Sequence, residues 1–155
     1  MAPIEKRRMT VEMDGPFVVF IIGMRINKWW KIHKWLPVAQ AMPRMLKELA
    51  GRTDTGFLGA QQHVGAIVQY WRSFDDLERY ARDHDAEHWP AWVAFNKKVG
   101  AASGDVGIWH ETYRIEAGQY EAIYVSTRPM GLGKIGRLVP AAGKRESARG
   151  RLSPS

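Results

Sequence analysis

Residues 17–26, FVVFIIGMRI, restrict the possible folds more than any other part of the chain. The run is rich in β-branched and aromatic residues and follows a Gly-Pro pair, which is typical of a strand. Apolar side chains occupy both alternating faces, so both faces have to be covered. We therefore predict a central strand, with helices on one side of its sheet and a second layer on the other.

The rest of the chain predicts helices and strands in a fixed order. Pro37 and Pro43 interrupt the first helical region and predict two or three short pieces there. Ser73, with Asp76 three residues later, has the pattern of a helix start. The predicted elements are helical pieces within 28–50, strands at 57–64 and 66–73, a helix from Ser73 to Pro90, a helical piece at 91–99, and strands at 106–115 and 119–127.

This order is β-α-β-β-α-β with an extra C-terminal strand, and it predicts an α+β fold of the ferredoxin-like type. The helices would cover one face of the sheet. The sheet of a second copy is the simplest cover for the other face, which predicts a homodimer, a dimeric α/β barrel. We expect one domain at residues 1–127 and a basic, Gly/Pro/Ser-rich extension at 128–155.

The basic charge of the chain is concentrated at one end. The net charge is +7, and residues 128–155 contain seven basic residues and one acidic residue. The remainder is nearly neutral, which argues against a nucleic-acid groove in the folded part. A solvated, disordered C-terminal end is the expected state of the extension.

The chain contains no cysteine, which excludes disulfides, thiolate metal sites and cysteine nucleophiles. The apolar run from Phe17 to Met24 is too short to span a membrane, and Arg25 follows it directly. No signal-peptide pattern precedes it. We therefore expect a soluble, cytoplasmic protein without stable membrane insertion.

His84 and His88 are four residues apart and would share a helix face. With Glu87 they fit the H-x-x-E-H pattern of some zinc proteases, although Pro90 follows at once. Alternatively, one histidine fills a helix–sheet contact and the other faces solvent. A third possibility is a single axial ligand to a haem between helix and sheet.

His110 lies in the middle of the strand predicted at 106–115 and shares a face with Ile108. That face mixes apolar and polar groups, as the wall of a pocket would, although a simple hydrogen-bonded strand histidine fits equally. Arg25 could bind a propionate or carboxylate or form a structural ion pair. We expect Asn27, Trp71 and Ile108 to line a substrate pocket, in which several of the seven tryptophans take part.

Two further motifs have competing interpretations. KWWKIHKW at 28–35 alternates basic and aromatic residues and could lie on an anionic membrane, although a pocket or dimer wall is the preferred interpretation. GLGKIG at 131–136 matches the dinucleotide-binding pattern G-x-G-x-x-G. It lacks the following helix, strand and acidic residue that such a site requires.

The phrases YWRSFDDLERYARDHDAEHWPAW and GIWHETYRI resemble the dimeric α/β-barrel superfamily, which includes antibiotic-biosynthesis-type monooxygenases and several small haem enzymes. Within it, the chain is similar to a bacterial and fungal family of unknown function that is often labelled monooxygenase-like. The motifs that carry this similarity are FIIGMRIN, MLKEL, GFLG, YWRSFDDLERYA, GIWHETY and GLGKIGRLVPA.

Residues 72–130 also resemble, more distantly, the C-terminal part of aldoxime dehydratases. That resemblance implies haem, with His88 on the iron and His110 as the distal catalytic residue. The chain is less than half as long as those enzymes, so a second copy would have to supply the rest. Monooxygenases of the superfamily that use no cofactor have the same fold.

The expected function is that of a small dimeric enzyme with an apolar pocket that acts on a small organic substrate. With haem, the chemistry would be dehydration or oxygen chemistry at the iron held by His88. Without it, His110 would be the base that deprotonates an activated substrate for oxidation. The alternative is a non-catalytic module that binds haem or a hydrophobic metabolite.

Overall fold

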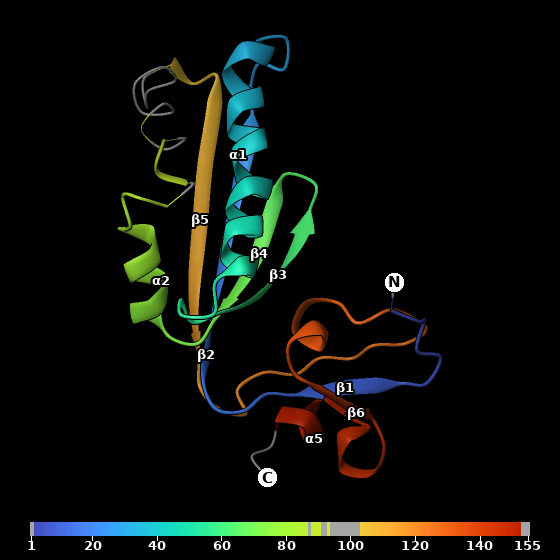
Figure 1. The fold of residues 1–155 in the computed structure, drawn as a ribbon. Helices are drawn as coiled ribbons and strands as arrows, with labels where there is room; N and C mark the ends of the chain where they lie inside the picture. The colour runs from blue at the N-terminus through green and yellow to red at the C-terminus, as the bar shows by residue number, and fades with distance from the viewer. Residues whose placement is uncertain (1, 87, 91–92, 94–102, 153–155) are drawn as a thin grey trace.

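The computed structural model describes residues 2–86, 88–90, 93 and 103–152. Its elements are β1 (Met9–Glu12), β2 (Phe17–Ile26), α1 (Ile32–Gly51), β3 (Phe57–His63), β4 (Ala66–Trp71), α2 (Phe74–Ala81), β5 (Val106–Ile115), the 3-10 helix η1 (Gly131–Lys134), β6 (Arg137–Pro140), the 3-10 helix η2 (Gly143–Arg145) and α5 (Ala148–Leu152). Figure 1 shows two lobes. The larger lobe contains β2 to β5 with α1 and α2, and the smaller lobe contains β1, β6 and α5.

The larger lobe is built on a four-stranded sheet in the order β3-β4-β2-β5, in which all neighbouring strands are antiparallel. This order and the βαββαβ connection are those of the ferredoxin-like fold, so the predicted α+β class is confirmed. β2 takes the central position that its two apolar faces predicted. The described residues form no closed barrel, so the dimeric barrel depends on a second chain and stays a prediction.

Both helices pack on one face of this sheet and form the core with it. Trp71 is fully buried there, between Phe57 and Tyr80, and its indole N–H donates to Gln69 Oε1 at 3.0 Å. The core cluster consists of Val18, Met45, Leu49, Trp71, Leu77, Tyr80 and Ala86. Neither α1 nor α2 covers the opposite face, but η1 lies against its β3 edge, where the N–H of Gly131 donates to Gln61 Oε1 at 3.4 Å.

α1 is one continuous helix of 20 residues that contains both prolines, so the prediction of short pieces is wrong. Its buried residues, Val38, Ala41, Met45 and Leu49, recur at helical spacing and face the sheet. Pro37 and Pro43 lie on the exposed side, where water can satisfy the carbonyl groups that lose their hydrogen bonds. Burial of the apolar stripe therefore outweighs the two missing bonds.

α2 begins as predicted but ends early. The Ser73 hydroxyl accepts a hydrogen bond from the backbone N–H of Asp76 at 3.1 Å. The helix ends at Ala81, so the predicted extension to Pro90 is wrong. Asp83 explains the end, because its carboxylate accepts from the N–H of Asp85 at 3.0 Å and favours a turn over a helix. The helical piece predicted at 91–99 lies almost entirely outside the described residues.

The segment 119–127 is not the predicted extra strand of the sheet. The turn at Gly118, with φ of 76°, precedes it, and the segment joins the smaller lobe through isolated bridges from Tyr124 to Met9 and from Thr127 to Glu5. The C-terminal strand of the described chain is β6, which pairs with β1 in a separate two-stranded sheet.

The described C-terminal segment is ordered against the body of the chain, so the prediction of a disordered end is wrong for residues 128–152. Acidic residues elsewhere neutralise its basic side chains. Arg137 and Arg145 both pair with Glu12, and Arg151 pairs with Glu121 at 2.8 Å. The basic side chains that suggested a solvated end are thus the groups that attach this segment to the rest of the chain.

Candidate functional site

His110 lies on the helix-bearing face of the sheet, on the side where β5 forms its edge. Cross-strand pairing sets His110 beside Ile22, and alternation places both on the face that carries the core residue Val18. We call this surface the β2–β5 wall. It consists of Phe20, Ile22 and Met24 of β2 and Ile108, His110 and Thr112 of β5.

The wall residues of β2 are apolar and partly buried, whereas those of β5 are exposed to solvent. The helices lie on this same face, but their main strand contacts are those of α1 with β3 and of α2 with β4. Ile108, His110 and Thr112 are accordingly exposed, whereas Phe20 and Ile22 are partly covered. A flat organic molecule could therefore contact the wall over an apolar surface.

His110 is the titratable group on this wall. Its ring lies against Phe20, with centroids 5.5 Å apart and planes at 42°. Within the described residues the imidazole makes no hydrogen bond or ion pair, so both ring nitrogens remain available. An accessible imidazole on an apolar surface can accept a proton from a bound molecule near neutral pH.

The structure keeps Arg25 and Asn27 apart from His110. Arg25 pairs with Gly107 on the opposite face of the sheet, and its Nε donates to Asn27 Oδ1 at 3.1 Å. The Asn27 amide donates in turn to the carbonyl of Gly104 at 3.0 Å. The two residues thus tie the end of β2 to the chain before β5.

Of the three residues expected to line a pocket, Ile108 alone shares the wall with His110. Asn27 lies beyond the end of β2. Trp71 has no exposed surface and fills the core at the opposite end of the wall's strands. The expected Trp-lined pocket is therefore not formed by these three residues within the described chain.

His88 is enclosed rather than presented to a cavity. Its Nε2 lies 3.1 Å from the carbonyl oxygen of Ala81, and its ring lies 4.8 Å from that of Tyr80. Nδ1 is buried and has no hydrogen-bond partner. An axial haem ligand needs a free nitrogen that faces the iron. In this arrangement His88 does not fit that role, and no contact joins it to His110.

The zinc-protease pattern is not supported by the described residues. His84 lies in the turn after α2 and stacks on Trp89 at 3.9 Å, so it does not share a helix with His88. Glu87 lies outside the described residues. No group of three or more His, Asp or Glu in the described chain is placed to hold a metal ion.

The opposite face is left uncovered along β5, where Tyr113 and Trp109 are exposed. Tyr113 pairs with Val19 of β2, Trp109 pairs with Gly23, and Glu111 lies between them beside Ile21. Trp109 lies across Gly23, where any β-carbon would overlap the indole ring. The glycine is therefore needed for the close approach of this ring.

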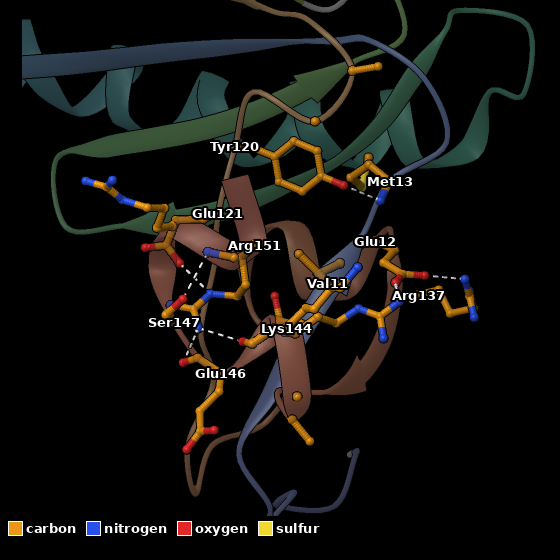
Figure 2. Close-up of a pocket in the computed structure, with 18 of the residues that line it drawn as sticks. Val11, Glu12, Met13, Tyr120, Glu121, Arg137, Lys144, Glu146, Ser147 and Arg151 are labelled. Atoms are coloured by element: carbon orange, nitrogen blue, oxygen red, sulfur yellow. Dashed lines mark hydrogen bonds and ion pairs between the residues drawn. The ribbon is translucent and has the colours of Figure 1, made fainter. Parts of the chain in front are cut away.

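A concave surface lies in the smaller lobe, between β1 and the chain from η2 to α5 (Figure 2). Its volume is about 1730 Å³, and Thr10 to Asp14 form one side. Arg137 and Arg145 engage Glu12 there, and the Tyr120 hydroxyl accepts from the N–H of Met13 at 2.6 Å. None of the described residues that line this groove is a histidine, and its ion pairs with Glu12 join β1 to the C-terminal segment.

Sequence reasoning missed the cluster around Asp105. The ammonium groups of Lys28, Lys34 and Lys31 surround its carboxylate, which is 2% exposed, and they hold the pKa of Asp105 well below its usual range. The spacing of the three lysines was a signal that their ends could converge. Their partner is more than 70 residues away in sequence, so it could not be identified without the fold.

The described chain is thus a ferredoxin-like α+β domain whose sheet carries an apolar wall with His110 exposed on it. Residues 17–132 match the family described as monooxygenase af470-like, and this span is more than half of the chain, which therefore belongs to that family. The match runs from the start of β2 into η1. It includes the β2–β5 wall and leaves out β1 and β6.

One relative is monooxygenase af470 of Aspergillus fumigatus (strain ATCC MYA-4609 / CBS 101355 / FGSC A1100 / Af293). It is 26% identical over 132 residues, which cover 77% of this chain and 46% of the relative. The chain thus spans about half the length of that protein. Among the described residues, no helix is long and apolar enough to cross a membrane.

Proposed function

We propose that this chain is a cofactor-independent monooxygenase for a small, flat organic molecule, with His110 as the base. The observation that carries the proposal is the accessible imidazole on the apolar β2–β5 wall, inside the span that matches the monooxygenase-like family. The substrate would lie against Phe20 and Ile22 with an acidic C–H or O–H group directed at His110.

The proposed reaction begins with proton transfer from the substrate to His110. The resulting carbanion passes an electron to O2, and the two radicals combine into a peroxide anion on the substrate carbon. The proton returned from His110 converts this anion into a hydroperoxide, and loss of water from the hydroperoxide forms a carbonyl group. The net change converts a CH2 group and O2 into a C=O group and water, so no external reductant is needed. General-base catalysis of this kind contributes about 10²–10⁴-fold to a rate.

Oxygen uptake with a panel of phenolic substrates tests this proposal. His110→Gln keeps a side chain that can form hydrogen bonds but cannot act as the base, so uptake should fall by about 100-fold or more. His84→Gln is the matched control, because His84 is exposed and lies off the wall. Wild-type uptake by His110→Gln would rule out the proposed role.

A non-catalytic binding module is the alternative from a different functional class. If the chain is such a module, wild type should bind the same phenols saturably, and neither wild type nor any variant should take up oxygen. Phe20→Ala would then weaken binding, since Phe20 supplies part of the apolar surface of the wall.

Haem binding through His88 stays a prediction that the enclosed position of this residue does not favour. The absorption spectrum of protein expressed with a haem supply tests it directly. A Soret band that His88→Ala removes would require His88 to turn away from Ala81, and it would replace the cofactor-free mechanism.

A homodimer through the uncovered sheet face is part of the proposal. The face presents Tyr113 and Trp109 to solvent, and a second copy would cover them and form the two-chain barrel. Light scattering should give about twice 17.7 kDa at micromolar concentration. Tyr113→Lys should lower the dimer fraction, whereas Ile4→Lys, at an exposed site in the smaller lobe, should not.

A further inference from the structure

The loop before α1 and the first turns of that helix expose an unusual amount of apolar surface. Trp29 and Trp30 are 73% and 60% exposed, and their rings meet edge to face with centroids 6.1 Å apart. Ile32 and Leu36 continue the exposed apolar surface into α1. We call these four residues the tryptophan tip. Figure 1 shows that the start of α1 lies at the end of the larger lobe farthest from the smaller lobe.

The tip is held in place rather than loosely arranged. The N–H groups of Asn27 and Lys28 donate to the carbonyl of Asp105 at 3.0 and 3.2 Å. The indole N–H of Trp35 donates to the carbonyl of Trp29 at 2.8 Å. These hydrogen bonds fix the backbone of the loop, and in this conformation the rings of Trp29 and Trp30 are exposed to solvent. An exposed apolar patch maintained in this way marks an interaction surface.

The charge around the tip restricts the kind of partner. Residues 15–47 contain six Lys or Arg and no Asp or Glu. Asp105, which comes from elsewhere in the chain, neutralises part of this charge at Lys28, Lys31 and Lys34, and a local excess of positive charge remains.

The position of these lysines is not explained by helix stability. Lys31 is the residue before α1 and Lys34 lies in its first turn, where no acidic residue is present. Cations at a helix N-terminus are unfavourable because the N-terminal end of the helix dipole is positive. Their position is favourable for an anionic partner that approaches this end of the molecule.

We propose that the tryptophan tip docks the protein onto the surface of an anionic phospholipid bilayer. Tryptophan rings favour the boundary between lipid headgroups and acyl chains, and the surrounding lysines attract anionic headgroups. The protein would lie on the membrane through its tip without crossing it, and the β2–β5 wall belongs to the same lobe. An apolar substrate dissolved in the bilayer would then be close to the enzyme.

Vesicle cosedimentation of the full chain tests the proposal. Wild type should sediment with vesicles that contain phosphatidylcholine and roughly one-third phosphatidylserine, and much less with phosphatidylcholine alone. Binding should weaken as the ionic strength rises from about 0.05 M to about 0.5 M, because the Debye length shortens. Equal binding to neutral and anionic vesicles, or no binding to either, would overturn the proposal.

Substitutions at the tip locate the binding surface. Trp29→Ser/Trp30→Ser should reduce binding by about tenfold or more, since each ring contributes apolar burial at the interface. Trp29→Phe/Trp30→Phe should retain most of it, which separates a membrane role from a general fault in folding. Ile4→Ser is the matched control, because Ile4 is an exposed apolar residue in the smaller lobe.

A second copy of the chain is the competing occupant of the tip. Light scattering on the same variants distinguishes the two. If Trp29→Ser/Trp30→Ser converts a wild-type dimer into a monomer, the tip is a dimer contact and the membrane proposal is wrong. An unchanged oligomeric state together with lost vesicle binding supports it.

Discussion

Arg151 should contribute more to stability than its place near the C-terminus suggests. Its side chain is 7% exposed, and its Nε donates to Glu121 Oε2 at 2.8 Å. One terminal nitrogen donates to the carbonyl groups of Arg145 and Glu146, both at 2.9 Å. Replacing Arg151 with alanine would leave a carboxylate and two carbonyl groups without these donors.

The expected cost follows from these three bonds. A hydrogen bond to a charged group is worth about 1.5–3 kcal/mol, and we reduce this to roughly 1–2 kcal/mol because Glu121 is partly exposed. The two carbonyl bonds add about 0.5–1 kcal/mol each. Arg151→Ala should therefore lower the free energy of unfolding by about 2–4 kcal/mol. Arg151→Lys should recover less than half, because one ammonium group cannot reach all three acceptors.

Urea unfolding followed by two signals measures this cost. All seven tryptophans precede residue 110, so tryptophan fluorescence reports the larger lobe, whereas circular dichroism reports the whole chain. If the two curves coincide, the loss applies to the whole molecule. If they separate, it applies to the smaller lobe.

The matched control is Lys144→Ala, an exposed site in the same segment, which should change stability by no more than about 0.5 kcal/mol. The reasoning is refuted if Arg151→Ala stays within about 0.5 kcal/mol of wild type by both signals.

Three further substitutions test the packing and charge described above. Gly23→Ala should cost about 1–3 kcal/mol in urea unfolding because its methyl group displaces the ring of Trp109, and the cost should largely disappear in a Trp109→Ala background. Tyr80→Phe should cost about 1–2 kcal/mol in the same assay, since it removes the hydroxyl that donates to Glu48 Oε2 at 2.9 Å. The lowered pKa of Asp105 implies stability that is present above the usual carboxyl pKa of about 3.9 and is lost as the pH falls toward the lower folded value. Asp105→Asn should therefore melt at a lower temperature than wild type at pH 7, with a gap that narrows below about pH 4; a constant gap would contradict this assignment.

The sequence predicted the elements whose pattern is local. β2 and β5 have the predicted bounds, because each is a run rich in β-branched and aromatic residues next to a glycine-containing turn. Ser73 likewise marked the start of α2. The ends of helices were less predictable. Pro37 and Pro43 did not break α1, since packing against the sheet decided its length, and the turn at Asp83 ended α2 before its apolar spacing did.

The candidate site was predictable only where its contacts join residues that are close in sequence. His110 and Ile108 share a face because strand alternation fixes it. The enclosure of His88 depends on the turn that brings it back to Ala81, which no spacing reveals. The order of the C-terminal segment depends on Glu12 and Glu121, whose distance in sequence from their arginine partners conceals the pairing.

The pairing of β1 with β6 has a consequence for the order in which the protein folds during synthesis. Met9 pairs with Pro140, so β1 has no strand partner until residues 137–140 have left the ribosome. The larger sheet needs only residues 17–115 and can form earlier. During that interval Met9 and Val11, both buried in the finished molecule, remain exposed on an unpaired strand. Closure of the smaller lobe is therefore expected to be a late step of folding, because its two strands are far apart in sequence.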